Sequence, residues 1–295
     1  MTNLMNISPQ ALFGQLLLGL MNGSFYAILS LGLAVIFGLL RIINFTHGAQ
    51  YMMGAFVAWL ALTYLGVGYW YSLILAPLAV GVIGALCERL LISRLKEVDH
   101  LYGLLLTFAL AQIIHGVFRN SFGASTVSFP VPELLARGID FGFLVLPAYR
   151  AWVICASFVV CLTTWFVIEK TRLGGHLRAA TENPVLTQAF GINVPLIVTT
   201  TYGFGAALAG FAGVLAAPIY SVNPSMGGDL LIVVFAVVVI GGMGSILGSI
   251  ATGFGLGIIE GLTKVVYPAG SDTVIFLIMI LVLLVKPAGL FGRRP

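Results

Sequence analysis

The chain has 295 residues, of which 60% are hydrophobic and only 8% are charged, and its formal net charge is +4. This composition excludes a water-soluble globular protein, because the chain is mostly apolar runs of 18 or more residues, which predict membrane-spanning helices. The positive charges fall at predicted helix ends rather than on one basic face, which argues against nucleic acid as a partner. No alternating pattern of a membrane barrel is present, so we expect an all-α, polytopic membrane bundle.

The expected spans are, in chain order, 11–40, 50–66, 70–92, 101–118, 150–168, 196–217, 229–247, 250–266 and 272–286. The first would be about 45 Å long as a straight helix, which exceeds the roughly 30 Å hydrocarbon core of a bilayer. It would therefore tilt, break, or fold back after Asn22-Gly23-Ser24. We expect about eight to nine transmembrane helices in a single transmembrane domain, 1–295.

Lysine and arginine gather on the cytoplasmic side of membrane proteins, and their distribution sets the expected orientation. Ten fall on the predicted inner side: Arg41, Arg89, Arg94, Lys96, Lys170, Arg172, Arg178, Lys286, Arg293 and Arg294. Four fall on the outer side: Arg119, Arg137, Arg150 and Lys264. The bias predicts a multi-pass protein of the cell inner membrane with its C-terminus inside. The side of the N-terminus depends on whether the first segment folds back.

The polar residues between the first two spans and before the seventh are unusual in so apolar a chain. Asn22, Asn44, His47, Gln50 and Asn223 are candidates for a solute path, because polar side chains in lipid are costly and mostly functional. The stretches 43–54 and 220–229 share an Asn, a helix stop, a Met-Gly and a new apolar helix. This similarity is either a faint inverted repeat, as in many transporter folds, or a chance match. For His47 the alternative is a capping or interfacial role. No metal is expected, since no second His, Cys or carboxylate stands at ligand spacing.

The longest outer segment is 119–149, where three prolines and several glycines predict a loop with a short surface helix at 131–137. This loop is either a docking place for another protein or a solvated connection. The chain contains 36 glycines, and many small residues recur every four positions: Gly253, Gly257 and Gly261; Gly244 and Gly248; Ala206 and Gly210; Ala209 and Gly213. Residues four apart share a helix face, so this spacing predicts close helix packing, or else faces that slide during gating.

Ionisable residues are nearly absent from the expected spans. Glu88 and His115 lie within a turn of predicted span ends, where we expect the interface to solvate them, and Glu260 is expected to pair with Lys264 at i,i+4. An ion-coupled carrier usually keeps a buried carboxylate relay, which argues against that class. The sequence has no HExxH, GxSxG or GxxxxGK[ST] motif. We therefore expect no catalytic site and no bound cofactor, and energy for transport would come from another subunit.

The inner loop 169–193 contains the chain's longest polar stretch. Asn183 as N-cap and Pro184 at the first helical position predict a short helix, PVLTQAFG, that stops at Gly191. One face of this helix is apolar, made of Val185, Leu186, Ala189 and Phe190. Such a helix either fits a groove on a partner protein or lies on the membrane surface.

The stretch RAATENPVLTQAFGINVP resembles the characteristic cytoplasmic loop of the permease subunits of LIV-type ABC importers for branched-chain amino acids. NGSFYAILSLGLAVIFGLLRIINFTHGAQYMMGAF, AGFAGVLAAPIYSVNPSMGG, VVVIGGMGSILGSIATGFGLGIIEGL and ILVLLVKPAGLFGR agree with the same family, and the resemblance covers about residues 10–293. It implies an ABC importer permease fold with a solute path between two permeases. It also implies four partners: a second homologous permease subunit, two cytoplasmic ATPase subunits that use ATP, and an extracytoplasmic substrate-binding protein.

In that resemblance Glu182, Asn183 and Pro184 occupy coupling-loop positions, and with Phe190 and Gly191 they are the expected contact with the ATPase subunits. Leucine, isoleucine and valine are the leading substrates. Related permeases serve urea and short amides, so the same importer type for those solutes is an alternative. Two further alternatives are an ATP-independent channel or carrier and a structural membrane protein without flux.

Overall fold

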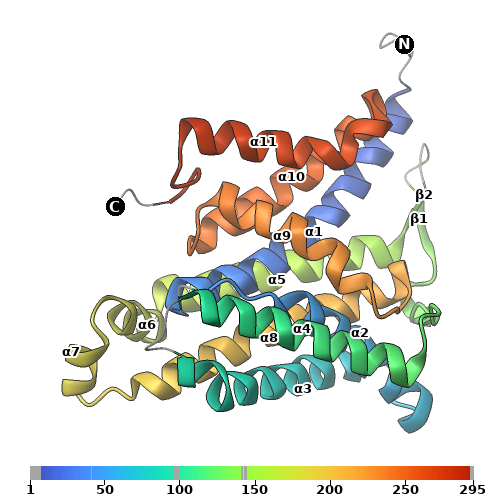
Figure 1. The fold of residues 1–295 in the computed structure, drawn as a ribbon. Helices are drawn as coiled ribbons and strands as arrows, with labels where there is room; N and C mark the ends of the chain where they lie inside the picture. The colour runs from blue at the N-terminus through green and yellow to red at the C-terminus, as the bar shows by residue number, and fades with distance from the viewer. Residues whose placement is uncertain (1–7, 41, 96–99, 141, 143–144, 293–295) are drawn as a thin grey trace. The chain divides into compact units, whose positions relative to one another are not determined.

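The computed structural model describes residues 8–40, 42–95, 100–140, 142 and 145–292. Four of the cations assigned to the inner side lie outside the described residues: Arg41, Lys96, Arg293 and Arg294. Nine apolar helices match the expected spans: α1 (Pro9–Leu40), α2 (Thr46–Leu65), α3 (Tyr69–Leu90), α4 (His100–Phe122), α5 (Ala148–Lys170), α8 (Val194–Tyr220), α9 (Met226–Gly241), α10 (Ile246–Val266) and α11 (Ser271–Val285). The predicted all-α bundle is therefore confirmed (Figure 1).

Within the described residues, seven candidate spans are long and apolar enough to cross a membrane, and α9 is a shorter apolar helix. The inner loop forms two more helices, α6 (Arg172–Glu182) and α7 (Pro184–Ala189). Short 3-10 turns follow α3 (η2, Ile92–Leu95) and precede α11 (η4, Pro268–Gly270).

The first segment is one continuous helix, so the break considered at Asn22-Gly23-Ser24 does not occur. Gly23 serves close packing instead of a turn, because a Cβ added there would lie 3.0 Å from the Cα of Phe254. At 1.5 Å per residue the 32 residues of α1 extend about 48 Å.

The outer segment contains less helix and more strand than its composition predicts. The expected surface helix at 131–137 is reduced to a single 3-10 turn, η3 (Glu133–Leu135). A hairpin that the sequence analysis missed follows it, with β1 (Gly138–Asp140) antiparallel to β2 (Val145–Pro147) and Ile139 opposite Leu146. These strands of three residues are too short to give a clear alternating pattern.

The chain divides into two compact units, each made of several segments. The first comprises residues 1–30, 131–162 and 233–295, and the second 31–130 and 163–232. Three of the boundaries fall inside α1, α5 and α9, and the fourth, at 130/131, falls in the outer segment.

Glycine contacts hold the helices of the first unit together. A Cβ at Gly257 would overlap the backbone of Gly19 and Gly23 on α1, and one at Gly253 would lie 2.6 Å from Ala27. The predicted packing role of the Gly253-Gly257-Gly261 spacing is therefore confirmed.

In the second unit, α8 packs against α2 and α3 in the same way. A Cβ at Gly54 would overlap the backbone of Gly210, and one at Gly213 would overlap the carbonyl of Tyr51. Gly203 and Gly81 also approach each other, less tightly, because a Cβ on Gly203 would lie 2.9 Å from the Gly81 carbonyl oxygen. These contacts confirm the predicted packing role of Gly210 and Gly213 and make α8 a central helix of this unit.

The glycine-rich break between α9 and α10 brings the end of the chain onto α9. Gly242 and Gly244 take left-handed backbone angles, with φ of 101° and 83°, and Ser245 caps α10 by accepting a bond from Gly248 N at 3.1 Å. The backbone N–H groups of Leu290 and Phe291 then donate to the carbonyls of Ile240 and Gly241 at 2.8 and 3.1 Å. These bonds satisfy terminal carbonyls of α9 that have no partner within the helix.

Candidate functional site

A buried polar cluster lies at the start of α2. The Asn44 Oδ1 atom accepts bonds from the Thr46 backbone N–H at 3.1 Å, from the Tyr202 hydroxyl at 3.1 Å and from the Thr46 hydroxyl. The Thr46 and Tyr202 hydroxyls are 2.9 Å apart, and Gln50 Nε2 donates to Thr46 Oγ1 at 3.5 Å. All these residues are buried, so the cluster ties α2 to α8 by hydrogen bonds in apolar surroundings.

His47 lies beside this cluster and is also buried. A Cβ at Gly32 would come 2.9 Å from His47 Cε1 and 2.9 Å from the Gly205 carbonyl oxygen. Only glycine at position 32 of α1 therefore leaves room for the His47 imidazole. The structure brings the predicted path residues Asn44, His47 and Gln50 into one unit, and their role in the path stays a prediction.

The start of α9 repeats the local geometry of α2. Asn223 Oδ1 accepts bonds from the backbone N–H and the hydroxyl of Ser225, both at 3.0 Å, as Asn44 Oδ1 does from Thr46. Both segments therefore read Asn-x-Ser/Thr-x-Gly, at 44–48 and 223–227. The two turns share this local geometry, and the inverted repeat stays a prediction.

The two glycines that end these motifs touch each other reciprocally. A Cβ on Gly48 would meet the Gly227 carbonyl group, and a Cβ on Gly227 would overlap the Gly48 carbonyl group. The starts of α2 and α9 therefore meet backbone to backbone, which no larger residue permits.

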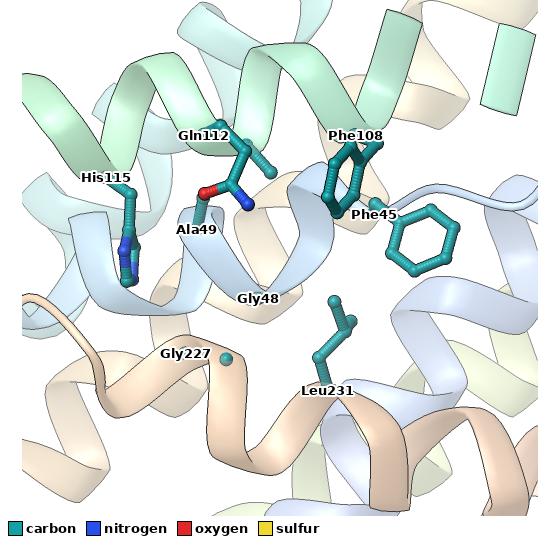
Figure 2. A pocket seen from close by; sticks show the side chains of 10 residues that line it. Phe45, Gly48, Ala49, Phe108, Gln112, His115, Gly227 and Leu231 are labelled. Carbon is teal, nitrogen blue, oxygen red and sulfur yellow. The ribbon is translucent and has the colours of Figure 1, made fainter. Parts of the chain in front are cut away.

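A pocket of about 270 Å³ opens beside this glycine contact (Figure 2). Figure 2 shows Gln112 and Phe108 pointing from α4 toward α2, with Leu231 rising from α9 opposite Phe45. The Phe45 and Phe108 rings pack edge to face with centroids 5.7 Å apart. The full lining is Phe45, Gly48, Ala49, Phe108, Ala111, Gln112, His115, Gly227, Gly228 and Leu231.

The pocket uses residues of α2 that alternate with the predicted path residues. Phe45, Gly48 and Ala49 line it, whereas Asn44 and Gln50 bond toward α8. Polarity alone singles out Asn44, His47 and Gln50, and it gives no signal for the apolar and glycine residues between them. The repeated Asn-x-Ser/Thr-x-Gly pattern was the signal that marks this place.

Glu88 is fully buried on α3, which corrects the expectation that the membrane interface solvates it. Its Oε2 atom accepts a bond from the Thr199 hydroxyl of α8 at 2.5 Å. The helix end was placed correctly, but α8 covers the carboxylate, and a burial of this kind depends on tertiary packing.

Asn22 lies in the first unit, in a cluster around Glu260. Lys264 Nζ is 2.5 Å from Glu260 Oε1, which confirms the predicted i,i+4 pair. Glu260 also accepts bonds from the Tyr26 hydroxyl at 2.6 Å and from Asn22 Nδ2 at 3.3 Å. The carboxylate therefore links α1 to α10, and Asn22 is bound in this link rather than grouped with Asn44.

The short helix α7 forms as predicted and ends at Ala189, two residues before the predicted stop at Gly191. Asn183 Oδ1 accepts the Leu186 N–H at 2.9 Å as the N-cap, and Pro184 occupies the first turn. The helix ends at Ala189, Phe190 is its C-cap, and Gly191 takes a left-handed φ of 81°. Glycine is favoured there because it adopts this conformation without steric cost.

The predicted apolar face of α7 is uncovered in this chain. Val185 is 79% exposed, Leu186 54% and Phe190 77%. Thr187 on the opposite face is buried, and its hydroxyl donates to the Asn183 carbonyl at 2.8 Å. The helix therefore presents apolar side chains outward from a fixed base.

The neighbouring helix α6 is held against the end of α5. Arg178 Nη1 donates to the Ile168 carbonyl at 3.1 Å and lies 3.6 Å from Glu169. A Cβ at Gly174 would overlap that same carbonyl, so glycine is needed for the approach. Ala180 packs with Val194 and other residues of α8, and Figure 1 shows α6 and α7 near the beginning of α8.

The chain matches a sequence model described as "Branched-chain amino acid transport system / permease component" over residues 15–283. It is 32% identical to the high-affinity branched-chain amino acid transport system permease protein BraD of Pseudomonas aeruginosa, over 95% of each chain. It is 29% identical to LivH of Escherichia coli over 95% of each chain. It is also 30% identical to LivM of Salmonella typhimurium over 75% of this chain and 57% of LivM. No solved structure matches.

Proposed function

Because the chain belongs to the family of branched-chain amino acid transport system permease components, we propose that it is the permease subunit of an ABC importer for leucine, isoleucine and valine. The observation that carries this proposal is the 32% identity with BraD over 95% of both chains. The nine apolar helices fit such a role, and they make the chain a multi-pass protein of the inner membrane.

The partners proposed are a second permease subunit, two cytoplasmic ATPase subunits and an extracytoplasmic binding protein. The similarity to LivM, which is also named a permease protein, supports a pair of related permeases. ATP would be bound and hydrolysed by the ATPase subunits, while this chain binds neither nucleotide nor another cofactor. The sequence supports this division because it contains no P-loop motif.

We propose that α7 receives the movement of an ATPase subunit. An exposed apolar face on a short amphipathic helix suits a groove of a partner protein. Asn183, Pro184 and Gly191 fix the ends of α7, and Arg178 fixes α6 to α5. Movement at the surface would therefore pass into α5 and α8 instead of being lost in a flexible loop.

The proposed solute path includes Asn22, Asn44, His47, Gln50 and Asn223. Their neutral amide and imidazole groups can exchange hydrogen bonds with a zwitterion without introducing a fixed net charge. Support comes from chain position, because Asn44 and Asn223 begin the two motifs whose glycines meet at the pocket. Simultaneous Asn44→Ala and His47→Ala replacement should lower uptake more than surface changes do. Uptake at the wild-type rate would assign both residues to capping alone.

The function is tested by reconstituting the chain with its genomic companions in liposomes and measuring uptake of labelled leucine. Uptake should require ATP on the side of the membrane that carries the ATPase subunits and the binding protein on the opposite side. A binding protein that holds urea and ignores leucine would overturn the substrate while leaving the importer. Leucine flux through this chain alone, without ATP, would instead indicate a channel or carrier.

The coupling proposal is tested separately with Glu182→Lys and Pro184→Leu. Both variants should reach the membrane and assemble, but ATP hydrolysis should no longer be matched by leucine uptake. Gln188→Ala, on the same helix at an exposed position, is the matched control and should behave as wild type. Normal coupled transport in both test variants would refute this role of α7.

A further inference from the structure

We propose that the pocket between α2, α4 and α9 binds the amino acid during transport, with the branched side chain against Phe45, Phe108 and Leu231. The polar end of the amino acid would face Gln112 and His115. This inference rests on the proposed function and adds the place where the permease itself holds its substrate.

The size and walls of the pocket fit a small apolar group. Its volume of about 270 Å³ lies just below the roughly 300–1,000 Å³ typical of drug-sized ligands. Phe45 and Phe108 fix one wall, because their edge-to-face contact restrains both rings. Leu231 faces them from α9 (Figure 2). A branched aliphatic side chain would bury apolar surface on both sides of this space.

The base of the pocket is set by the glycine contact. The Cβ position of Gly48 lies 2.5 Å from the Gly227 carbonyl oxygen and that of Gly227 lies even closer to the Gly48 carbonyl oxygen, so a side chain on either would force α2 and α9 apart. The matching hydrogen bonds of Asn44 and Asn223 fix the turn before each helix. The pocket is therefore built on rigid backbone, as a binding site requires.

The polar groups of the lining point to a neutral, zwitterionic ligand. The His115 Nε2 atom is inaccessible to solvent and has no hydrogen-bond partner among the described residues, which is unusual for a buried polar atom. Gln112, three residues earlier on α4, adds an amide donor and acceptor. The lining contains no Lys, Arg, Asp or Glu, so a charged substrate side chain would be desolvated without a partner.

The direct test uses the reconstituted importer and a diazirine analogue of leucine that labels its neighbours under light. Peptide mapping should find the label on residues lining the pocket, and excess leucine should suppress it. Ala111→Trp, which fills the pocket, should lower labelling and leucine uptake by roughly tenfold or more. Ile113→Trp is the matched control, because Ile113 lies two residues on in α4 but is exposed and outside the lining.

A second variant keeps the test valid if the Ala111→Trp protein fails to fold. Leu231→Ala enlarges the pocket and should shift the ratio of leucine to phenylalanine uptake toward phenylalanine by roughly tenfold. Labels confined to other helices, with an unchanged ratio in Leu231→Ala, would overturn the pocket as a binding site. If wild-type importer transports leucine in that experiment, the proposed function stands. If it does not transport but competitive labelling still maps to the pocket, only the importer proposal fails.

Discussion

The contact between the starts of α2 and α9 differs from the α6–α7 segment in which side chains are buried and which are exposed. At the start of α2 the polar side chains are buried and hydrogen-bonded, at the start of α9 Asn223 is half-buried and hydrogen-bonded, and the glycine backbones of the two helices touch. On α7 the polar groups form the ends and base, and Val185, Leu186 and Phe190 are exposed.

The difference indicates two kinds of recognition in one chain. A buried, glycine-built site suits a small solute, whose few atoms require a space of defined size. An exposed apolar helix face suits a protein partner, which covers a larger surface around a few anchoring side chains. The contrast also predicts which changes damage the fold and which damage only an interaction.

The largest effect is expected from Gly227→Val. The new side chain would overlap the Gly48 carbonyl group, and overpacking of this kind costs about 3 kcal/mol or more. Size-exclusion chromatography in detergent should show loss of the folded species. Gly228→Ala is the control, because a Cβ at Gly228 would meet no described atom within 4 Å. A stable Gly227→Val protein would disprove the tight contact.

Phe190→Asp should have the next largest effect, and on coupling rather than folding. Phe190 is 77% exposed, so its loss leaves the chain's own packing intact, while loss of an anchoring side chain at an interface costs about 2 kcal/mol of binding. Co-purification of ATPase subunits and leucine uptake per ATP should both fall. Equal co-purification of the variant and the wild type would remove Phe190 from the contact.

The two repeated asparagines should differ in their contribution to stability. Asn44→Ala leaves the buried Thr46 and Tyr202 hydroxyls short of a partner, with an expected cost of about 1–3 kcal/mol. Asn223→Ala affects a half-buried turn where water can replace the amide, so we expect at most about 1 kcal/mol. Thermal unfolding in detergent measures both, and an equal decrease would show that burial does not separate the two motifs.

The smallest effect is expected from Arg178→Ala. The pair with Glu169 is nearly half exposed on both sides, so its contribution is at most about 1 kcal/mol. Glu169→Gln removes the charge pair but keeps the bond from Arg178 to the Ile168 carbonyl. A larger loss of coupled uptake in Arg178→Ala than in Glu169→Gln would show that the carbonyl bond holds α6 in place.

Much of this architecture follows from local patterns in the sequence. Long apolar runs predict the spans because lipid leaves the backbone no other partners. The cap at Asn183 and the proline after it predict α7, and the four-residue spacing of Gly253, Gly257 and Gly261 predicts a packing face, because each pattern acts within one or two turns of helix.

The rest depends on which helices meet, which one-dimensional spacing does not contain. The continuity of α1 follows from Gly23 packing against Phe254, and the burial of Glu88 follows from Thr199 on α8. The pocket likewise requires α4 to face α2 and α9. Composition predicts the polar residues near it, while Phe108 and Leu231 resemble any other apolar residue of a span.

The bonds from Leu290 and Phe291 to the end of α9 have a consequence for biosynthesis. Ile240 and Gly241 leave the ribosome about fifty residues before the segment that completes their hydrogen bonds, an interval longer than α10 and α11 combined. Until translation reaches Leu290 and Phe291, these two carbonyls at the end of a membrane helix need other hydrogen-bond partners. The end of α9 therefore gains its mature hydrogen bonds only after both α10 and α11 have been made.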